Sequence, residues 1–202
     1  MKIKNWMTSN PITVKPNTPV MEASKLMKEH GIRRLPVVKG GKVVGIVTHR
    51  NLLEASPSAA TTLSIHELNY LIAKLEVGEV MQKNPICVSP EDSVIEVMTM
   101  GRQKGIGAFP VVDNGRLVGI VTETEIFRAM MHLFGGKEDG DGFLVLANVR
   151  LRERIGAMSR IASIIEELNV PVLAMFSLPH RRAEGNRLYV RVQAQKMDEV
   201  KK

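Results

Sequence analysis

Apolar residues recur at helical spacing soon after the start of the chain. Val20 begins the pattern, which places Ala23, Leu26 and Met27 on the same helix face. Thr18 is a favoured N-cap residue, and Pro19 suits the first helical position. A glycine commonly ends a helix, so the pattern predicts an amphipathic helix that stops at Gly31.

Alternating apolar runs follow, and they predict β-hairpins. LPVV and VVGIVT flank Lys39-Gly40-Gly41-Lys42, and later FPVV and LVGIVT flank Asp113-Asn114-Gly115-Arg116. Asn114-Gly115 suits a tight turn that needs positive φ angles. After Thr48 and Thr122 the apolar spacing becomes helical again.

These elements belong to an internal repeat with an offset of 74 residues. In the 46 aligned pairs from Met7/Met81 to Leu52/Ile126, 19 are identical. The identities include Pro11/Pro85, Pro36/Pro110, Gly45/Gly119 and Thr48/Thr122. The chain therefore contains two copies of one unit, each with a short strand, a helix, two strands and a second helix.

A predicted linker helix separates the copies. Ser56-Pro57-Ser58 marks a loop, and Ser64 with Glu67 forms a capping box. The apolar residues that follow share one helix face: Ile65, Leu68, Leu71, Ile72 and Leu75. This helix packs either on the body of the protein or on a second subunit, and the sequence leaves both readings open.

The last third of the chain predicts a separate small domain. A polar, glycine-rich segment at 135–142 marks the boundary. The following pattern predicts a strand, a helix and two further strands, at 143–149, 157–168, 170–178 and 187–195. Residues from Met197 onward match the first turn of another helix.

Composition indicates a folded, soluble protein. The 202 residues are 44% hydrophobic and 24% charged. Cys87 is the only cysteine, which excludes an intramolecular disulfide, and its apolar neighbours predict a small buried side chain. No signal peptide or membrane-length apolar segment is present, so we expect a cytoplasmic protein with no membrane association.

The positive charge is uneven, but it does not point to nucleic acid. The formal net charge is +7, with +2 on residues 1–142 and +5 on residues 143–202. Aromatic residues, which stack on bases, are only 4% of the chain, so nucleic-acid binding is an unfavoured hypothesis. The five histidines share no ligand spacing, and we expect no metal site.

The repeated motifs resemble a known family. PITV or PICV, then GIRRLPVV or GIGAFPVV, then GIVTHRN or GIVTETE, resemble a tandem pair of CBS (cystathionine β-synthase) domains, the Bateman module, over residues 1 to about 134. The segment Glu153-Arg154-Ile155-Gly156-Ala157-Met158 resembles the strand-to-helix turn of an ACT domain. The combination is similar to acetoin utilization AcuB-type proteins.

The resemblance implies an α+β (mixed α/β) fold. It consists of two CBS-type β-α-β-β-α repeats in a pseudo-two-fold pair, followed by a partial ferredoxin-like (ACT) β-α-β-β domain that lacks the closing helix and strand. The expected domains are CBS repeat 1 (1–54), a linker with a helix (55–77), CBS repeat 2 (78–134), a Gly-rich linker (135–142) and the ACT-like domain (143–202).

The resemblance also implies an adenosine-type ligand in the cleft between the copies. The preferred half-site combines residues of both: Ile12, Thr13, Arg33, Arg34, Leu35, Pro36, Arg50, Thr122 and Glu125. A carboxylate accepts both ribose hydroxyls, and guanidinium groups hold phosphates. Glu125 is one methylene longer than the Asp of the family pattern. Alternatively, Arg33 and Arg34 are simply solvated, and the threonines bond locally.

A second half-site is expected to be weaker. It comprises Thr48, Asn51, Ile86, Gly107, Ala108 and Phe109. Asn51 replaces the carboxylate, and Gly107-Ala108 offers no phosphate partner, so the site is weak, empty or suited to a nucleoside with little negative charge. In the tail, Arg152, Glu153 and Gly156 either line an amino-acid pocket or form a helix-entry turn.

These features together imply a regulatory protein with no catalytic residues and no obligatory cofactor. The expected ligand is AMP, ADP or ATP, and the signal passes to the ACT-like domain or to a regulated enzyme or other protein partner, for instance in acetoin metabolism and energy sensing. A homodimer is expected. Alternatives are a fragment related to an inosine-monophosphate-dehydrogenase-like enzyme, an S-adenosylmethionine-binding regulator and a DNA-associated regulator.

Overall fold

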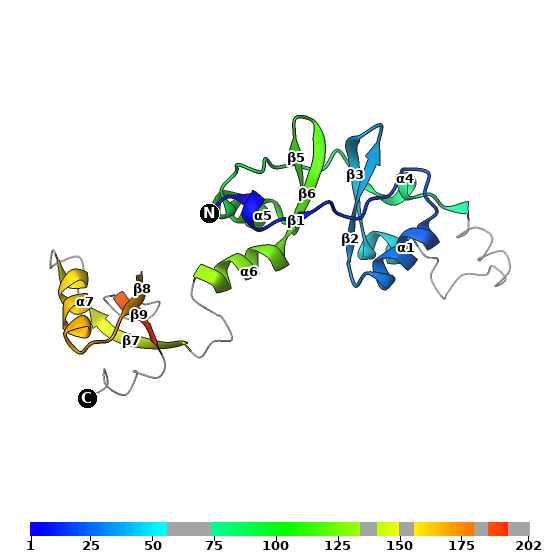
Figure 1. The fold of residues 1–202 in the computed structure, drawn as a ribbon. Coiled ribbons are helices and arrows are strands. Elements are labelled where there is room, and N and C mark those ends of the chain that lie inside the picture. Colours follow the sequence, from blue (N-terminus) through cyan, green and yellow to red (C-terminus); the bar gives the residue numbers. More distant parts are fainter. Residues whose placement is uncertain (56–73, 134–140, 150–155, 180–185, 194–202) are drawn as a thin grey trace. The chain divides into compact units, whose positions relative to one another are not determined.

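The computed structural model describes residues 1–55, 74–133, 141–149, 156–179 and 186–193. Its contacts divide the chain into two compact units, Met1–Ala129 and Met130–Lys202, each of which is described by itself (Figure 1). The predicted linker helix with Ser64 and Glu67 and most of the glycine-rich segment lie outside the described residues.

The first unit begins with the elements of repeat 1. After the 3-10 turn η1 (Ile3–Asn5) and strand β1 (Thr8–Ser9) come α1 (Val20–Glu29), β2 (Arg34–Lys39), β3 (Lys42–Thr48) and α2 (His49–Glu54). The predicted helix and hairpin are confirmed. The predicted cap is wrong by one residue: Pro19 is the N-cap of α1, and the Thr18 hydroxyl instead accepts the Lys15 N–H at 3.0 Å.

Repeat 2 has the same order of elements. It comprises α4 (Val77–Val80), β4 (Gln82–Lys83), α5 (Val94–Lys104), β5 (Ala108–Asp113), β6 (Arg116–Thr122) and α6 (Glu123–Leu133). The turn between β5 and β6 has φ angles of +47° at Asn114 and +78° at Gly115. Both central residues are left-handed, as a tight hairpin requires.

The two repeats exchange their leading strands. β1 of repeat 1 pairs with β6 of repeat 2, and β4 of repeat 2 pairs with β3 of repeat 1. The resulting sheets have the orders β1-β6-β5 and β2-β3-β4, with every pairing antiparallel. Each sheet therefore contains strands of both repeats.

Buried side chains anchor the exchanged segments. The Ile3 N–H donates to Asp92 O at 2.9 Å, and the Ile3 side chain is fully buried. At the equivalent position 74 residues later, the Val77 N–H donates to Thr18 O at 2.9 Å, and Val77 is also fully buried. Each repeat thus contributes a backbone bond and an apolar residue to the other.

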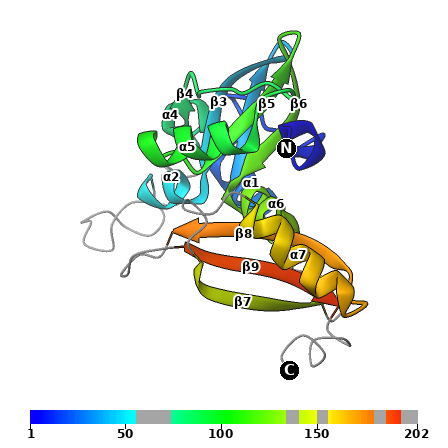
Figure 2. The ribbon, with the colours of Figure 1, turned by 90° about the vertical axis from the view of Figure 1, so that its left-hand side faces the viewer.

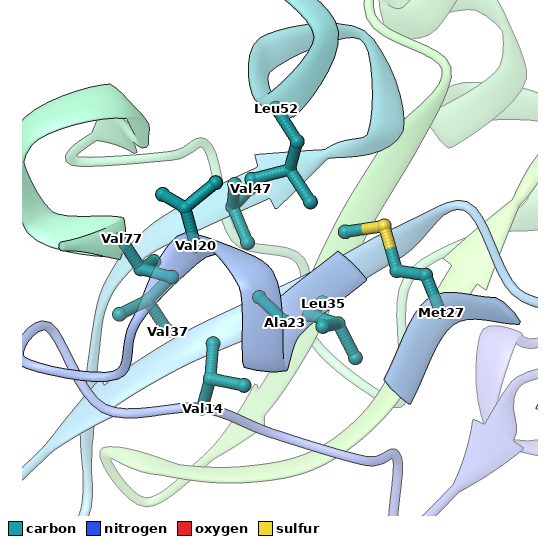
Figure 3. Close-up of a cluster of buried hydrophobic side chains, with 9 residues drawn as sticks. All are labelled: Val14, Val20, Ala23, Met27, Leu35, Val37, Val47, Leu52 and Val77. Carbon is teal, nitrogen blue, oxygen red and sulfur yellow. The ribbon is translucent and has the colours of Figure 1, made fainter. Parts of the chain in front are cut away.

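Apolar packing within and between the repeats completes the unit. One core of repeat 1 gathers residues from α1, β2, β3 and α2, together with Val14 of the segment before α1 and Val77 of the exchanged segment (Figure 3): Val14, Val20, Ala23, Met27, Leu35, Val37, Val47, Leu52 and Val77. At the seam between the repeats, Ile46 of β3 packs with Ala108 and Ile120 of the β5–β6 hairpin. The centre of the seam is therefore apolar.

The second unit is a three-stranded sheet with one helix. Its elements are β7 (Asp141–Val149), α7 (Ala157–Glu167), β8 (Val172–Pro179) and β9 (Asn186–Gln193), in the predicted order. β9 lies between β7 and β8 and is antiparallel to both, which is a split β-α-β arrangement. α7 covers one face of the sheet (Figure 2), where Ile165 packs with Leu188, Val190 and Val192.

The prediction for Cys87 is wrong. The Cys87 side chain is exposed, because the neighbouring Val88 is the residue whose side chain is buried. The backbone of Val88 forms a β-bridge with Val111. Partial desolvation raises the pKa of the Cys87 thiol. A raised pKa leaves less thiolate at neutral pH, so exposure does not make this cysteine a strong nucleophile.

The exchanged segments predict a stability effect at two equivalent positions. Ile3→Ala and Val77→Ala should each lower the free energy of unfolding by about 2–4 kcal/mol, because each opens a cavity where one repeat packs on the other. Denaturant unfolding of the full chain measures the loss. Met21→Ala, at an exposed apolar position of α1, is the control and should change stability little.

An ion pair at the amino terminus predicts a pH dependence. Lys2 and Lys4 bond the Glu91 carboxylate, the latter at 2.7 Å, and together lower the pKa of Glu91 to about 2 from 4.5. Because the folded-state pKa is depressed, this stabilisation is present above pH 4.5 and is lost as the pH falls towards 2. Melting temperatures of Glu91→Gln should therefore depend less on pH in that window than those of the wild type or of Glu22→Gln.

Candidate functional site

Glu125 is the centre of the candidate site. It is 7% exposed, and it is the only buried charged side chain in the part of the chain that the structure describes. One carboxylate oxygen accepts the backbone N–H of Thr122 at 2.9 Å and the Thr122 hydroxyl. This is a local cap of α6, so the fold of the first helical turn fixes the carboxylate at the end of β6.

The second oxygen of Glu125 reaches the other repeat. The Thr8 hydroxyl, on the exchanged strand β1, donates to Glu125 Oε1 at 3.3 Å. Hydrogen bonds from Thr8 and Thr122 satisfy the buried carboxylate, as burial of a charge requires. A ligand hydroxyl at this position would compete with Thr8 or use the remaining lone pairs.

The segment around Ile12 and Thr13 lies alongside β2. The Val14 N–H donates to Pro36 O at 3.1 Å, and the Val38 N–H donates to Val14 O at 2.9 Å. The Leu35 side chain is fully buried in the core of repeat 1, so Leu35 offers a ligand only its backbone. Thr13 is exposed, while Ile12 and Pro36 are half-buried and buried, respectively.

The three predicted arginines differ in their partners. Arg34 Nη2 lies 3.4 Å from Glu123 Oε2, which joins the start of β2 to the start of α6 across the seam. Arg50 Nε donates to Glu54 Oε1 at 2.7 Å along its own helix, and this bond raises the pKa of Arg50 above its ordinary value. Arg33 is exposed, and its carbonyl accepts the His49 N–H at 2.8 Å.

The second half-site has a similar cap without the charge. Asn51 Oδ1 accepts the Thr48 N–H at 3.0 Å and the Thr48 hydroxyl at 2.7 Å. Gly107 lies against the Arg34–Glu123 pair, since a Cβ added to it would lie 2.7 Å from Arg34 Nη2.

The apolar members of the second half-site divide between core and edge. Ala108 belongs to the apolar seam. The Phe109 side chain is buried, with 1% exposed, and Ile86 is half-buried. No cationic side chain occupies the positions of repeat 2 that correspond to Arg33 and Arg34.

The predicted ACT ligand set is described only in part. Arg152 and Glu153 lie outside the described residues. Gly156 is the N-cap of α7 with a φ of +82°, and its carbonyl accepts the Ser159 hydroxyl at 2.9 Å. This left-handed backbone favours glycine.

A pocket of about 700 Å³ lies at the hairpin turns of the first unit. Its lining combines the two turns and adjoining strand residues with the segment between β1 and α1: Asn10, Pro11, Thr13, Val38, Gly40, Gly41, Lys42, Asn114, Gly115, Arg116 and Leu117. Thr13 is its only residue in common with the predicted half-sites. Two cations and no carboxylate line it.

Two other classes of site find no support in the described ranges. No three His, Cys, Asp or Glu side chains gather there in a metal-binding arrangement. Nor does any helix among those residues have the length and hydropathy to span a bilayer.

Sequence reasoning missed Thr8 and Glu123. Thr8 precedes the recognised motif by only a few residues, but its contact with Glu125 depends on the strand exchange. Glu123 stands at a variable position of the GIVTETE motif, where repeat 1 has His49. The available signal was charge alone, since Arg34 and Glu123 are opposite charges in the two segments expected to face each other.

Comparison with known proteins identifies the class. The family model for the CBS domain matches residues 3–58 and 77–132, which is more than half of the chain. The chain therefore belongs to the CBS-domain family, and the tandem repeat is a CBS pair. CBS pairs are regulatory modules that often bind adenosine-type ligands.

Particular relatives extend this result. The inosine-5'-monophosphate dehydrogenase of Korarchaeum cryptofilum is 34% identical over 68% of this chain and 26% of its own length. Across the first three curated relatives, the chain spans 26%, 50% and 24% of their lengths. These matches cover the CBS part alone, so they do not show that this chain has the activity of any of these larger proteins.

Solved structures agree with the fold of the first unit. A Vibrio cholerae protein assigned to acetoin utilization (AcuB) matches with TM-score 0.56 at 29% identity, covering 66% of this chain and 93% of that one. The CBS pair of protein MJ0100, in complex with 5'-methylthioadenosine and S-adenosyl-L-methionine, matches with TM-score 0.54 at 34% identity. The match covers 68% of this chain and 98% of that one. CBSX2 of Arabidopsis thaliana in complex with AMP matches with TM-score 0.54 at 29% identity, covering 66% of this chain and 98% of that one.

The Thr8–Glu125 bond predicts a stability effect of its own. Thr8→Val should lower the free energy of unfolding by about 1–2 kcal/mol, because a buried carboxylate loses a hydrogen-bond donor. Thermal or denaturant unfolding measures this effect. Thr13→Val, at an exposed threonine, is the matched control, and an equal loss in both variants would contradict the role given to Thr8.

Proposed function

We propose that this protein is a non-catalytic sensor that binds an adenine nucleotide in its CBS pair. The ligand, AMP, ADP or ATP, occupies the half-site of Thr122 and Glu125, with its ribose at the Glu125 carboxylate. Ile12, Thr13 and the Leu35-Pro36 backbone contact the base, and Arg33, Arg34 and Arg50 contact the phosphates.

One observation carries this proposal. Arg34 of repeat 1 reaches across the seam to the first turn of α6, where it lies 3.4 Å from Glu123 and two residues from Glu125. A guanidinium of repeat 1 thus contacts the helical turn of repeat 2 that carries the buried carboxylate. This combination suits a ligand that carries both a diol and a phosphate.

The second half-site favours a different ligand. Thr48 and Asn51 retain the helix cap but offer no charge, and Gly107-Ala108 replaces the arginine pair. We propose that this half-site is weak or takes a nucleoside with little negative charge. An S-adenosyl or methylthioadenosine ligand is therefore the second candidate, and the MJ0100 complex supports it.

Ligand binding would act through the seam. Occupancy changes the packing between the repeats. This change in packing is passed to the second unit, proposed to be an ACT-like domain, or to a partner protein. Such coupling requires different ligand affinities in two states, typically worth ~1–3 kcal/mol. A cytoplasmic homodimer that regulates acetoin or carbon metabolism is the setting that the AcuB likeness supports.

Ligand titration tests the proposal directly. Calorimetry of the full chain with AMP, ADP, ATP and S-adenosylmethionine should give at least one dissociation constant between about micromolar and millimolar. Arg33→Ala/Arg34→Ala should weaken AMP binding about tenfold or more, since charge-assisted bonds are lost. Arg102→Ala, at an exposed arginine of α5, is the control and should bind AMP as the wild type does.

Three outcomes would reverse the conclusion. If none of the four ligands binds up to millimolar concentration, the sensor proposal fails. If nucleotide is consumed during the titration, the enzyme-fragment alternative replaces it. Salt-dependent retention on DNA would instead favour the DNA-associated alternative.

A further inference from the structure

We propose that Glu123 sets the charge selectivity of the Thr122–Glu125 half-site. Glu123 bonds Arg34 in the structure, so a ligand phosphate competes with this carboxylate for the guanidinium. An uncharged adenosine ligand leaves the pair intact. This inference rests on the proposed function, and it adds that one carboxylate decides how strongly phosphorylated ligands are favoured.

Glu123 is the more exposed member of its pair with Arg34. Glu123 is the first residue of α6 and Arg34 is the first residue of β2, so the pair joins the two repeats. The Arg34 side chain is 29% exposed, whereas that of Glu123 is 76% exposed. Glu123 is therefore the member of the pair that can move into solvent when another anion arrives.

The backbone of Gly107 lies directly against the Arg34–Glu123 pair. A Cβ built on Gly107 would lie 2.7 Å from Arg34 Nη2 and 2.9 Å from Glu123 Oε2. The Glu123 N–H also donates to Gly107 O at 3.3 Å, which fixes the start of α6 against this backbone. The absence of a side chain at Gly107 thus allows the two charges to meet at the seam.

Two of the three arginines at the proposed phosphate position already have carboxylate partners. Of the three arginines, Arg34 bonds Glu123, and Arg50 bonds Glu54 at 2.7 Å. Arg33 is the one for which the described part of the chain shows no carboxylate partner. A phosphate therefore exchanges existing ion pairs for new ones, and the net gain is smaller than three free guanidinium groups would give.

Glu123 acts more strongly on a phosphate than Glu54 does. The Arg50–Glu54 pair is an i,i+4 contact on one exposed helix surface, where solvent screens it. The Arg34–Glu123 pair crosses the seam and involves the less exposed guanidinium. Removing the Glu123 charge both frees Arg34 and removes repulsion of the incoming phosphate.

Paired titrations with AMP and 5'-methylthioadenosine test the inference. Glu123→Gln should strengthen AMP binding about three- to tenfold and leave methylthioadenosine binding unchanged, because only AMP carries a phosphate. The gain should shrink at high ionic strength. Glu22→Gln, at an exposed carboxylate of α1, is the matched control, and melting temperatures verify that each variant is folded.

An Arg34→Ala background tests the route of the effect. There, Glu123→Gln should give a smaller gain, because Arg34 is no longer there to be released and only the relief of repulsion remains; an undiminished gain would overturn competition for Arg34. Measurable binding with an unchanged ratio of AMP to methylthioadenosine affinity would overturn the inference alone. Failure of these two ligands, and also of ADP, ATP and S-adenosylmethionine, to bind any variant would overturn the proposed function together with it.

Discussion

The exchange of leading segments between the repeats determines how the first unit is built. Ile3 and Val77 are each buried in the opposite repeat, and β1 and β4 each extend the opposite sheet. Gly119 and Gly45 allow this close approach, since a Cβ at either would overlap the sulfur atom of Met7 or Met81. The candidate site depends on the same constraint, because Thr8 reaches Glu125 only through β1.

Local patterning predicted the helices and hairpins, but it could not predict the exchange. The hairpins are recognisable because residues such as Asn114 and Gly115 have a backbone requirement of their own. A two-residue strand such as β1 carries no periodicity, and its sequence is equally compatible with either sheet. Cys87 was misplaced for a related reason: the apolar run around it does not say which residue faces the core, and Val88 does.

The site shows a similar division between what residue types predict and what only packing decides. Its preferred half could be assembled from the motif resemblance, and the structure brings Arg34 and the Thr122–Glu125 turn together. The charges alone did not fix the Arg34–Glu123 pair, because a long charged side chain can reach several partners, whereas Arg50–Glu54 is an i,i+4 pair on one helix. The backbone is nearly two-fold symmetric, whereas the charges are not: His49 of repeat 1 corresponds to Glu123.

The position of β9 in the second unit affects the order in which that unit forms. β9 is the central strand, yet it follows both of its neighbours in the chain. Until it emerges during synthesis, β7 and β8 have no strand between them, and the apolar face of α7 has no Leu188, Val190 or Val192 to cover. Any product that stops before residue 186 would therefore lose the whole sheet at once rather than one edge of it.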